Sequence, residues 1–126
     1  MDVLNYEVLK KSGYDVYILE KAPEKVMQFG EGNFLRAFVD YWFDVSNEKA
    51  GWNGKCVLVQ PIKPGLAEMI NKQEGLYTLY LRGRENGEKV DKKRVISAVS
   101  RCLNPYVESD FESMMELARS DDLEYI

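Results

Sequence analysis

A glycine pair with one acid between them, Gly30-Glu31-Gly32, separates a short apolar run from a long apolar segment. Between a strand and a helix, such glycines let backbone N–H groups close on a dinucleotide pyrophosphate, which the helix dipole also favours. Gly30 would turn the chain out of the strand, and Gly32 would let the backbone approach the phosphates. Because Leu35 stands where the usual pattern has a third glycine, the pair alone favours a cofactor turn and a plain tight turn equally.

Two charged residues beside the glycines bear on this choice. Arg36 falls in the first turn of the expected helix, where the helix dipole disfavours a cation by up to ~1 kcal/mol unless an anion is close. Arg36 therefore either pairs with Asp40 one turn later, which is worth ~0.3 kcal/mol, or faces a cofactor phosphate or a substrate carboxylate. Glu31 would repel a pyrophosphate unless its side chain turns to solvent or to Arg36.

The end of the second apolar run lacks the acid that usually holds the adenosine ribose of a dinucleotide. Gln60 stands there instead and could hydrogen-bond a ribose, while Lys63 would tolerate a 2′-phosphate. These two residues leave the preference between NAD and NADP open.

The chain has 126 residues and no histidine, which excludes Ser–His and Cys–His nucleophile pairs and imidazole zinc sites within it. Its two cysteines, Cys56 and Cys102, lie in apolar segments and lack the spacing of metal ligands. We therefore expect buried, reduced thiols and no metal site.

The net charge of −4, with acids and bases interspersed, argues against a nucleic-acid surface or an anionic membrane as the partner. No apolar run approaches the ~20 residues of a membrane span, and the first residues lack the apolar core of a secretion signal. The sequence predicts a single compact cytoplasmic domain.

A strand, a helix and a second strand must hold the glycine turn. Apolar runs at 25–29 and 56–60 predict two buried strands, and the pattern over 33–48 predicts a helix with Asn33 as its N-cap. A strand–helix–strand unit of this length predicts a parallel sheet with a right-handed connection.

The helix predicted over 33–48 has an unusual distribution of polar residues. They form one stripe, and nearly all other positions are apolar or aromatic, so we expect the wide apolar face to be covered by more than one neighbour. The stripe comprises Arg36, Asp40, Asp44 and Asn47.

The remaining segments add a hairpin and further helices. Asn86-Gly87 is a strong hairpin signal between two predicted antiparallel strands attached to the parallel sheet. Residues 1–24 are a lead-in with a short helix, and a new strand is expected to begin at 123–126. The sequence also predicts strands at 76–82 and 95–103 and helices at 66–72 and 110–120, the last with Asp110 near its N-cap.

Residues Val26 to Asp40 together resemble the N-terminal signature of the mannitol dehydrogenase family, which replaces the third glycine by the pattern G-x-G-x-F-x-R. The resemblance covers about residues 24–126 and favours the cofactor turn over the plain turn. Further matching segments are Val57–Pro61, Gln73–Thr78, Leu81–Gly83 and Glu85–Glu88.

This resemblance implies an α/β fold, with a Rossmann-like, mostly parallel sheet and an added antiparallel hairpin, as the N-terminal part of a two-domain protein. Residues 25–126 would be a partial NAD-binding domain, and a mostly helical C-terminal domain would supply the catalytic lysine, which leaves no catalytic residue in this chain. The cofactor-binding residues that it implies are Val26, Met27, Gln28, Phe29, Gly30, Glu31, Gly32, Asn33, Phe34, Leu35, Arg36 and Ala37.

The resemblance further implies an NAD-dependent oxidoreductase for a small sugar acid or polyol, which would be bound through the second domain. The alternative is a non-catalytic nucleotide-binding or interaction module. If the chain is a fragment, we expect it to be inactive alone and to self-associate through the apolar helix face and the strand edge at 123–126. The exact substrate and the oligomeric state stay open.

Overall fold

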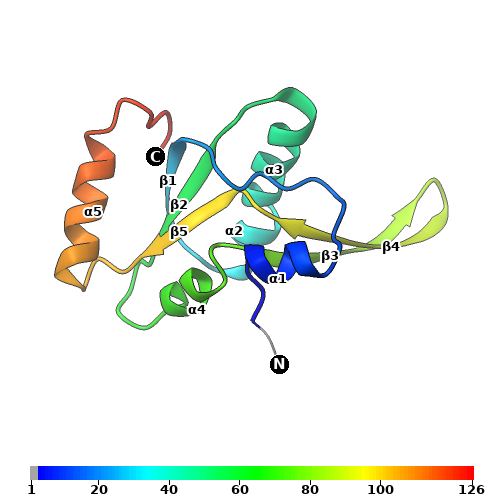
Figure 1. Cartoon of the computed structure of the whole chain (residues 1–126), viewed down its shortest axis with the longest axis horizontal. Helices are drawn as coiled ribbons and strands as arrows, with labels where there is room; N and C mark the ends of the chain where they lie inside the picture. Colours follow the sequence, from blue (N-terminus) through cyan, green and yellow to red (C-terminus); the bar gives the residue numbers. More distant parts are fainter. Residues whose placement is uncertain (1–2) are drawn as a thin grey trace.

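A parallel sheet of three strands forms the centre of the computed structural model, which describes residues 3–126 (Figure 1). The strands β1 (Glu24–Phe29), β2 (Lys55–Val59) and β5 (Val99–Leu103) run in the order β1-β2-β5. A long hairpin forms a separate two-stranded sheet and projects away from this one. The other elements are α1 (Tyr6–Lys11), α2 (Asn33–Ala37), α3 (Val39–Ala50), α4 (Ala67–Lys72), β3 (Tyr77–Glu85), β4 (Glu88–Ile96) and α5 (Glu108–Ala118).

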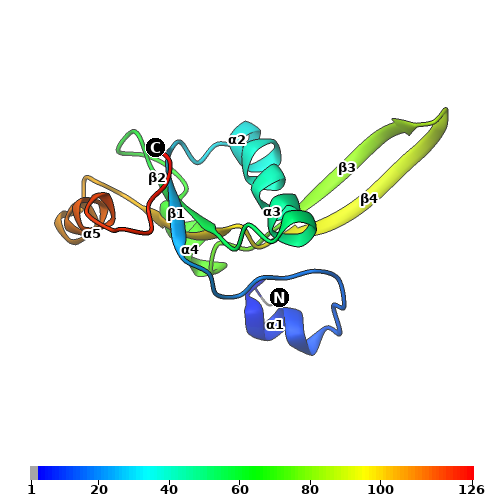
Figure 2. The same cartoon turned by 90° about the horizontal axis from the view of Figure 1, so that it is seen from above.

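The sheet is covered on both faces, which is why its strands appear as continuous apolar runs in the sequence. One face packs against α3 and α4, and the other packs against α5 through Leu117 (Figure 2). The first face presents Val26, Cys56, Leu58, Val99 and Cys102, and the second presents Met27, Val57, Val59 and Leu103. Both cysteines are free and buried, as predicted.

The predicted strand–helix–strand unit is confirmed, with β1 and β2 pairing in parallel. Its helix, however, is divided into two helices, because Phe38, with φ −115° and ψ −70°, interrupts the helical backbone between α2 and α3. The prediction of Asn33 as N-cap is also wrong. Gly32 occupies that position, and the Asn33 side chain accepts a hydrogen bond from Arg36 at 2.7 Å instead.

The hairpin turn at Asn86-Gly87 is confirmed, and both residues have the positive φ that this turn requires. The strand predicted over 95–103 is wrong, because those residues belong to two different sheets. Val95 and Ile96 end β4. The strand is interrupted at Ser97, and β5 then joins the parallel sheet beside β2.

The lead-in forms the short helix α1, as predicted, and covers the base of the hairpin. Tyr6 and Leu9 of α1 pack with Leu76 and Val95 in a third apolar cluster. Within residues 3–126, no helix is both long and apolar enough to cross a membrane.

The last helix and the end of the chain largely follow prediction. The predicted helix at 110–120 is α5, which begins two residues earlier, and Asp110 accepts a hydrogen bond from the Asn104 N–H at 2.9 Å rather than capping the helix. Tyr125 then pairs in parallel with Val26, so the expected strand at 123–126 forms a bridge on the free edge of β1.

The polar stripe of α3 faces inward, and part of the helix's wide apolar face is exposed in this chain. Asp40 and Asp44 are fully buried, and Asn47 is 5% exposed. Asn47 exchanges hydrogen bonds of 2.9 and 3.0 Å with the backbone of Gly54, and Asp44 accepts from the backbone N–H of Ser97 at 2.9 Å. Buried backbone groups at the ends of strands need such partners, and the stripe supplies them.

Candidate functional site

Gly30 is required by the conformation of the turn that follows β1. Its φ of +136° is one that other residues rarely adopt, and its N–H still donates to the Val59 carbonyl at 2.9 Å. A Cβ at this position would lie 2.6 Å from Cδ1 of Leu35. The residue that replaces the third glycine of the common pattern therefore packs directly onto the first glycine.

Gly32 is not required by the fold. Its φ of −67° and ψ of 166° suit any residue, and a Cβ built on it would meet no atom within 4 Å. Open space therefore remains in front of the start of α2, where the first backbone N–H groups have no partner within the helix. The exposed Gly32 leaves the backbone at the start of α2 accessible to a cofactor diphosphate, so the residues present are consistent with a dinucleotide site.

Arg36 bonds to the backbone of the turn. Its Nε donates to the Glu31 carbonyl at 2.9 Å, and its guanidinium lies 5.2 Å from the ring centre of Tyr77. The Tyr77 hydroxyl donates in turn to the carbonyl of Arg36. Of the two predicted alternatives, the ion pair with Asp40 does not form among the described residues, so Arg36 instead stabilises the loop that would receive an anion.

Glu31 meets neither condition under which an acid beside a pyrophosphate would be tolerable, since it is turned away from solvent and forms no ion pair with Arg36 among the described residues. The residue is only 9% exposed, and its charge acts on the Cys102 thiol of β5. Burial, followed by the Glu31 charge, raises the pKa of the Cys102 thiol to about 12. An acid therefore remains beside the turn and lowers the affinity that the backbone could otherwise give an anion.

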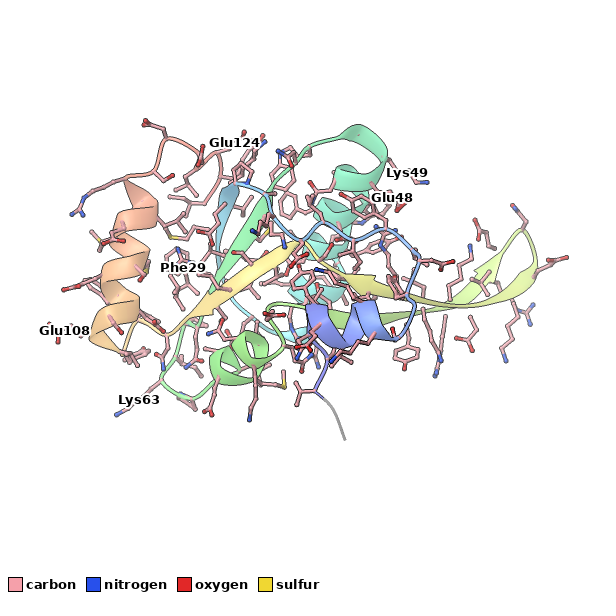
Figure 3. The ribbon with its side chains drawn as sticks, viewed as in Figure 1. Phe29, Glu48, Lys49, Lys63, Glu108 and Glu124 are labelled. Carbon is pink, nitrogen blue, oxygen red and sulfur yellow. The ribbon has the colours of Figure 1, made fainter. Side chains whose placement is uncertain are left out.

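Gln60 is not free to bind a ribose. Its Nε2 donates to the carbonyls of Ile62 and Lys63 at 2.9 and 2.7 Å, and its Oε1 accepts from the Ala67 N–H at 3.1 Å. The side chain thus closes the loop after β2. Lys63 is exposed on that loop, at the rim of the molecule (Figure 3).

Sequence reasoning missed the role of Asp40, which lies beneath the glycine turn. Gln28 Nε2 donates both to the Gly30 carbonyl at 3.1 Å and to Asp40 Oδ2 at 3.2 Å. Burial raises the pKa of Asp40 to about 7. The regular spacing of Asp40, Asp44 and Asn47 was the available signal, but a period does not say which side of a helix is buried.

The other predicted cofactor residues fall into two groups. Val26 and Met27 are buried in the core on opposite faces of the sheet, in the strand that leads into the turn. Phe29, Phe34 and Ala37 are exposed around the turn.

A second polar region lies at the opposite end of the sheet, where the strands begin. A cavity of about 590 Å³ is lined there by Lys55, Tyr6, Glu24 and Arg101, among others. The Lys55 ammonium donates to the Tyr6 hydroxyl at 2.9 Å, and burial lowers the pKa of Lys55 to about 8. This cavity is separate from the glycine turn.

A parallel strand–helix–strand unit with a glycine turn at the carboxyl end of its first strand defines the Rossmann class of α/β domains. Within that class, the chain belongs to the mannitol dehydrogenase family, because the family's pattern for the mannitol dehydrogenase Rossmann domain matches residues 24–124. The family resemblance and the fold class expected from the sequence are thereby confirmed.

Relatives and solved structures agree with this assignment. The altronate oxidoreductase of Bacillus subtilis (strain 168) is 42% identical over 94% of this chain, and that of Phocaeicola vulgatus is 40% identical over all of it. The chain spans 24% of the length of each. A Pseudomonas fluorescens mannitol 2-dehydrogenase, solved as a ternary complex with NAD and D-mannitol, superposes with a TM-score of 0.74 at 22% identity, over 97% of this chain and 25% of that one.

Proposed function

We propose that this chain binds NAD at the turn after β1 and is the cofactor-binding part of an oxidoreductase that interconverts D-altronate and D-tagaturonate. The observation that carries the proposal is Gly32 itself: the fold does not require a glycine there, and the space left by the missing side chain would admit a diphosphate. Identity of about 40% to altronate oxidoreductases supports the choice of substrate. The buried free thiols Cys56 and Cys102 support a cytoplasmic location.

In this proposal the bound cofactor supplies the hydride chemistry, and the chain supplies position. The backbone at Gly30 and Gly32 receives the diphosphate, while Arg36 holds the turn in shape through the Glu31 carbonyl. The other members of the segment from Val26 to Ala37 act by fixing β1 and the start of α2. A sugar acid would bind mainly to parts of a longer protein beyond these residues.

Two rival functions remain distinguishable by assay. A mannitol or fructuronate dehydrogenase of the same family would use the same turn with a different substrate. A non-catalytic nucleotide-binding module would bind NADH without turnover in any longer protein that contains this chain. Comparing D-tagaturonate, D-fructuronate and D-fructose as substrates of that longer protein, with NADH as reductant, separates the three. We expect fastest NADH oxidation with D-tagaturonate, and equal rates with all three, or none, would contradict the proposal.

The chain by itself is expected to show no tagaturonate-dependent NADH oxidation. Proton transfer to the substrate needs a group that changes charge near neutral pH and also touches the substrate. Asp40 is fully buried beneath the turn, and Arg36 does not deprotonate in proteins. Loss of NADH absorbance with purified chain measures this, with a full-length altronate oxidoreductase as the positive control. Turnover near ~1 s⁻¹ or faster, an ordinary enzyme rate, would show that the chain carries its own catalytic group.

The chain by itself is also expected to self-associate through the outward aromatic face of α2 and α3. Phe34 is 75% exposed, and Phe38 and Trp42 are each 54% exposed. The rings of Phe34 and Phe38 stack with centres 5.6 Å apart, so they form one continuous apolar surface. The free edge beyond Tyr125 adds unpaired backbone groups.

Sedimentation at several concentrations tests this expectation. The double variant Phe38→Lys/Trp42→Lys should be monomeric where the wild type is dimeric or larger, whereas Phe111→Lys on α5 should behave like the wild type. Phe111 is a matched control because it is 47% exposed on a different helix. A wild-type chain that stays monomeric at all concentrations would contradict the expectation.

A further inference from the structure

A buried carboxyl group joins the glycine turn to the helix behind it. Asp40 is fully buried in α3, and its Oδ2 accepts from Gln28 Nε2, which also donates to the Gly30 carbonyl. One amide therefore connects the end of β1, the turn and α3. The second oxygen, Asp40 Oδ1, has no hydrogen-bond partner among the described residues.

Burying the Asp40 carboxylate in this way lowers the stability of the fold. A buried carboxylate with one unpartnered oxygen loses more hydration than a single amide hydrogen bond returns. Asp44, one turn further along α3, is different, because both of its oxygens are bonded, to Ser97 and to Arg94. Asp40 differs from Asp44 because, besides the Gln28 amide, only the Cys56 thiol, a weak donor on β2, hydrogen-bonds to it.

The groups that face Asp40 come from each element packed around it. The Cys56 thiol on β2 and the Arg36 cation on α2 lower the pKa of Asp40, against the larger effect of burial. On β3, burial raises the pKa of Tyr77, and the charge of Asp40 raises it further. Arg36 makes no ion pair with Asp40, since its Nε and Nη2 donate to the Glu31 carbonyl and to Asn33. Burial therefore dominates, and it raises the pKa of Asp40 to about 7.

We propose that Asp40 is a positioning residue that, through Gln28, sets the Gly30 carbonyl and makes the affinity of the turn for a dinucleotide depend on pH. The proposal rests on the proposed NAD function. When Asp40 is protonated, no charge lies beneath the turn. When it is ionised, its negative charge opposes the cofactor diphosphate, so affinity falls as the pH rises through neutrality.

The first test is an NADH titration from about pH 6 to about pH 8. The wild-type Kd is expected to rise about fivefold over this range, as two like charges near a protein surface would produce. Asp40→Asn keeps an acceptor for Gln28 but has no charge, so its Kd should stay flat and close to the low-pH value of the wild type. Asp91→Asn, on the exposed hairpin, should keep the wild-type pH dependence.

The second test does not need the cofactor. In the free chain, the amide shift of Gly30 in a ¹⁵N NMR spectrum should titrate near pH 7, and the titration should vanish in Asp40→Asn and shrink in Gln28→Met. The chain has no histidine to titrate in this range, and Lys55 lies at the other end of the sheet. A Gly30 amide that does not titrate, or that titrates unchanged in Asp40→Asn, overturns the proposal. If Gly30 titrates as expected but NADH does not bind, the proposed NAD function fails and the positioning role stands.

Discussion

Gly32→Val is expected to weaken NADH binding about a hundredfold while the fold is kept. The branched side chain would occupy the open space before α2 and hold the diphosphate away from the backbone N–H groups. Loss of about two charge-assisted hydrogen bonds, at ~1.5 kcal/mol each, corresponds to this change in Kd. Because the backbone of Gly32 suits any residue, the substitution introduces no strain.

Fluorescence titration with NADH measures the affinity, and circular dichroism and the unfolding temperature report the fold. Gly83→Val is the matched control, because a Cβ there would also meet no atom within 4 Å and the residue lies in β3 of the hairpin. Gly32→Ala should show a smaller loss in the same direction. An NADH affinity of Gly32→Val equal to that of the wild type would mean that Gly32 is only a turn residue.

Asp44→Ala is expected to lower the free energy of unfolding by about 3–5 kcal/mol, the usual cost of removing one partner from a buried ion pair. Asp44 is fully buried, and Arg94, which donates to it at 2.9 Å, is largely buried too. The substitution would leave that guanidinium with Glu48 alone. It would also leave the Ser97 backbone N–H, at the break between β4 and β5, without its acceptor.

Urea unfolding measures this loss. The control is Asp91→Ala, because Asp91 forms an exposed pair with Arg82 at 3.5 Å and such pairs contribute ~0–1 kcal/mol. The double variant Asp44→Leu/Arg94→Met should recover part of the stability, since replacing both members of a buried pair by apolar groups is often tolerated. A loss below ~1 kcal/mol for Asp44→Ala would contradict the structural role given to the inward stripe.

The parts of the fold that depend on local pattern were predictable. The apolar runs gave both parallel strands, and Asn86-Gly87 fixed the hairpin turn through its backbone preference. The interruption at Ser97 was not predictable, because 95–103 is rich in strand-forming residues throughout and the interruption depends on a contact with Asp44, 53 positions away in the chain. Periodicity likewise could not show that the polar side of α3 is the buried one.

The candidate site was predictable in outline for a similar reason. The glycine pair and the residues after it indicated the turn, and the geometry explains why Gly30 is needed and why Leu35 can replace a glycine. The partners of Gln60 and Arg36 were not predictable, because both side chains bond to backbone groups whose positions the loops determine. The same holds for Asp40, whose position beneath the turn depends on how α3 packs.

A residue-resolved NADH titration of the ¹⁵N-labelled chain tests most directly the central claim, that the turn after β1 binds the cofactor. The largest amide shift changes are expected at Gly30, Gly32 and the following residues of α2, with smaller changes at the end of β2. The cavity around Lys55, at the opposite end of the sheet, serves as the internal reference. An absence of shifts at the glycine turn, or shifts confined to that cavity, would contradict the claim.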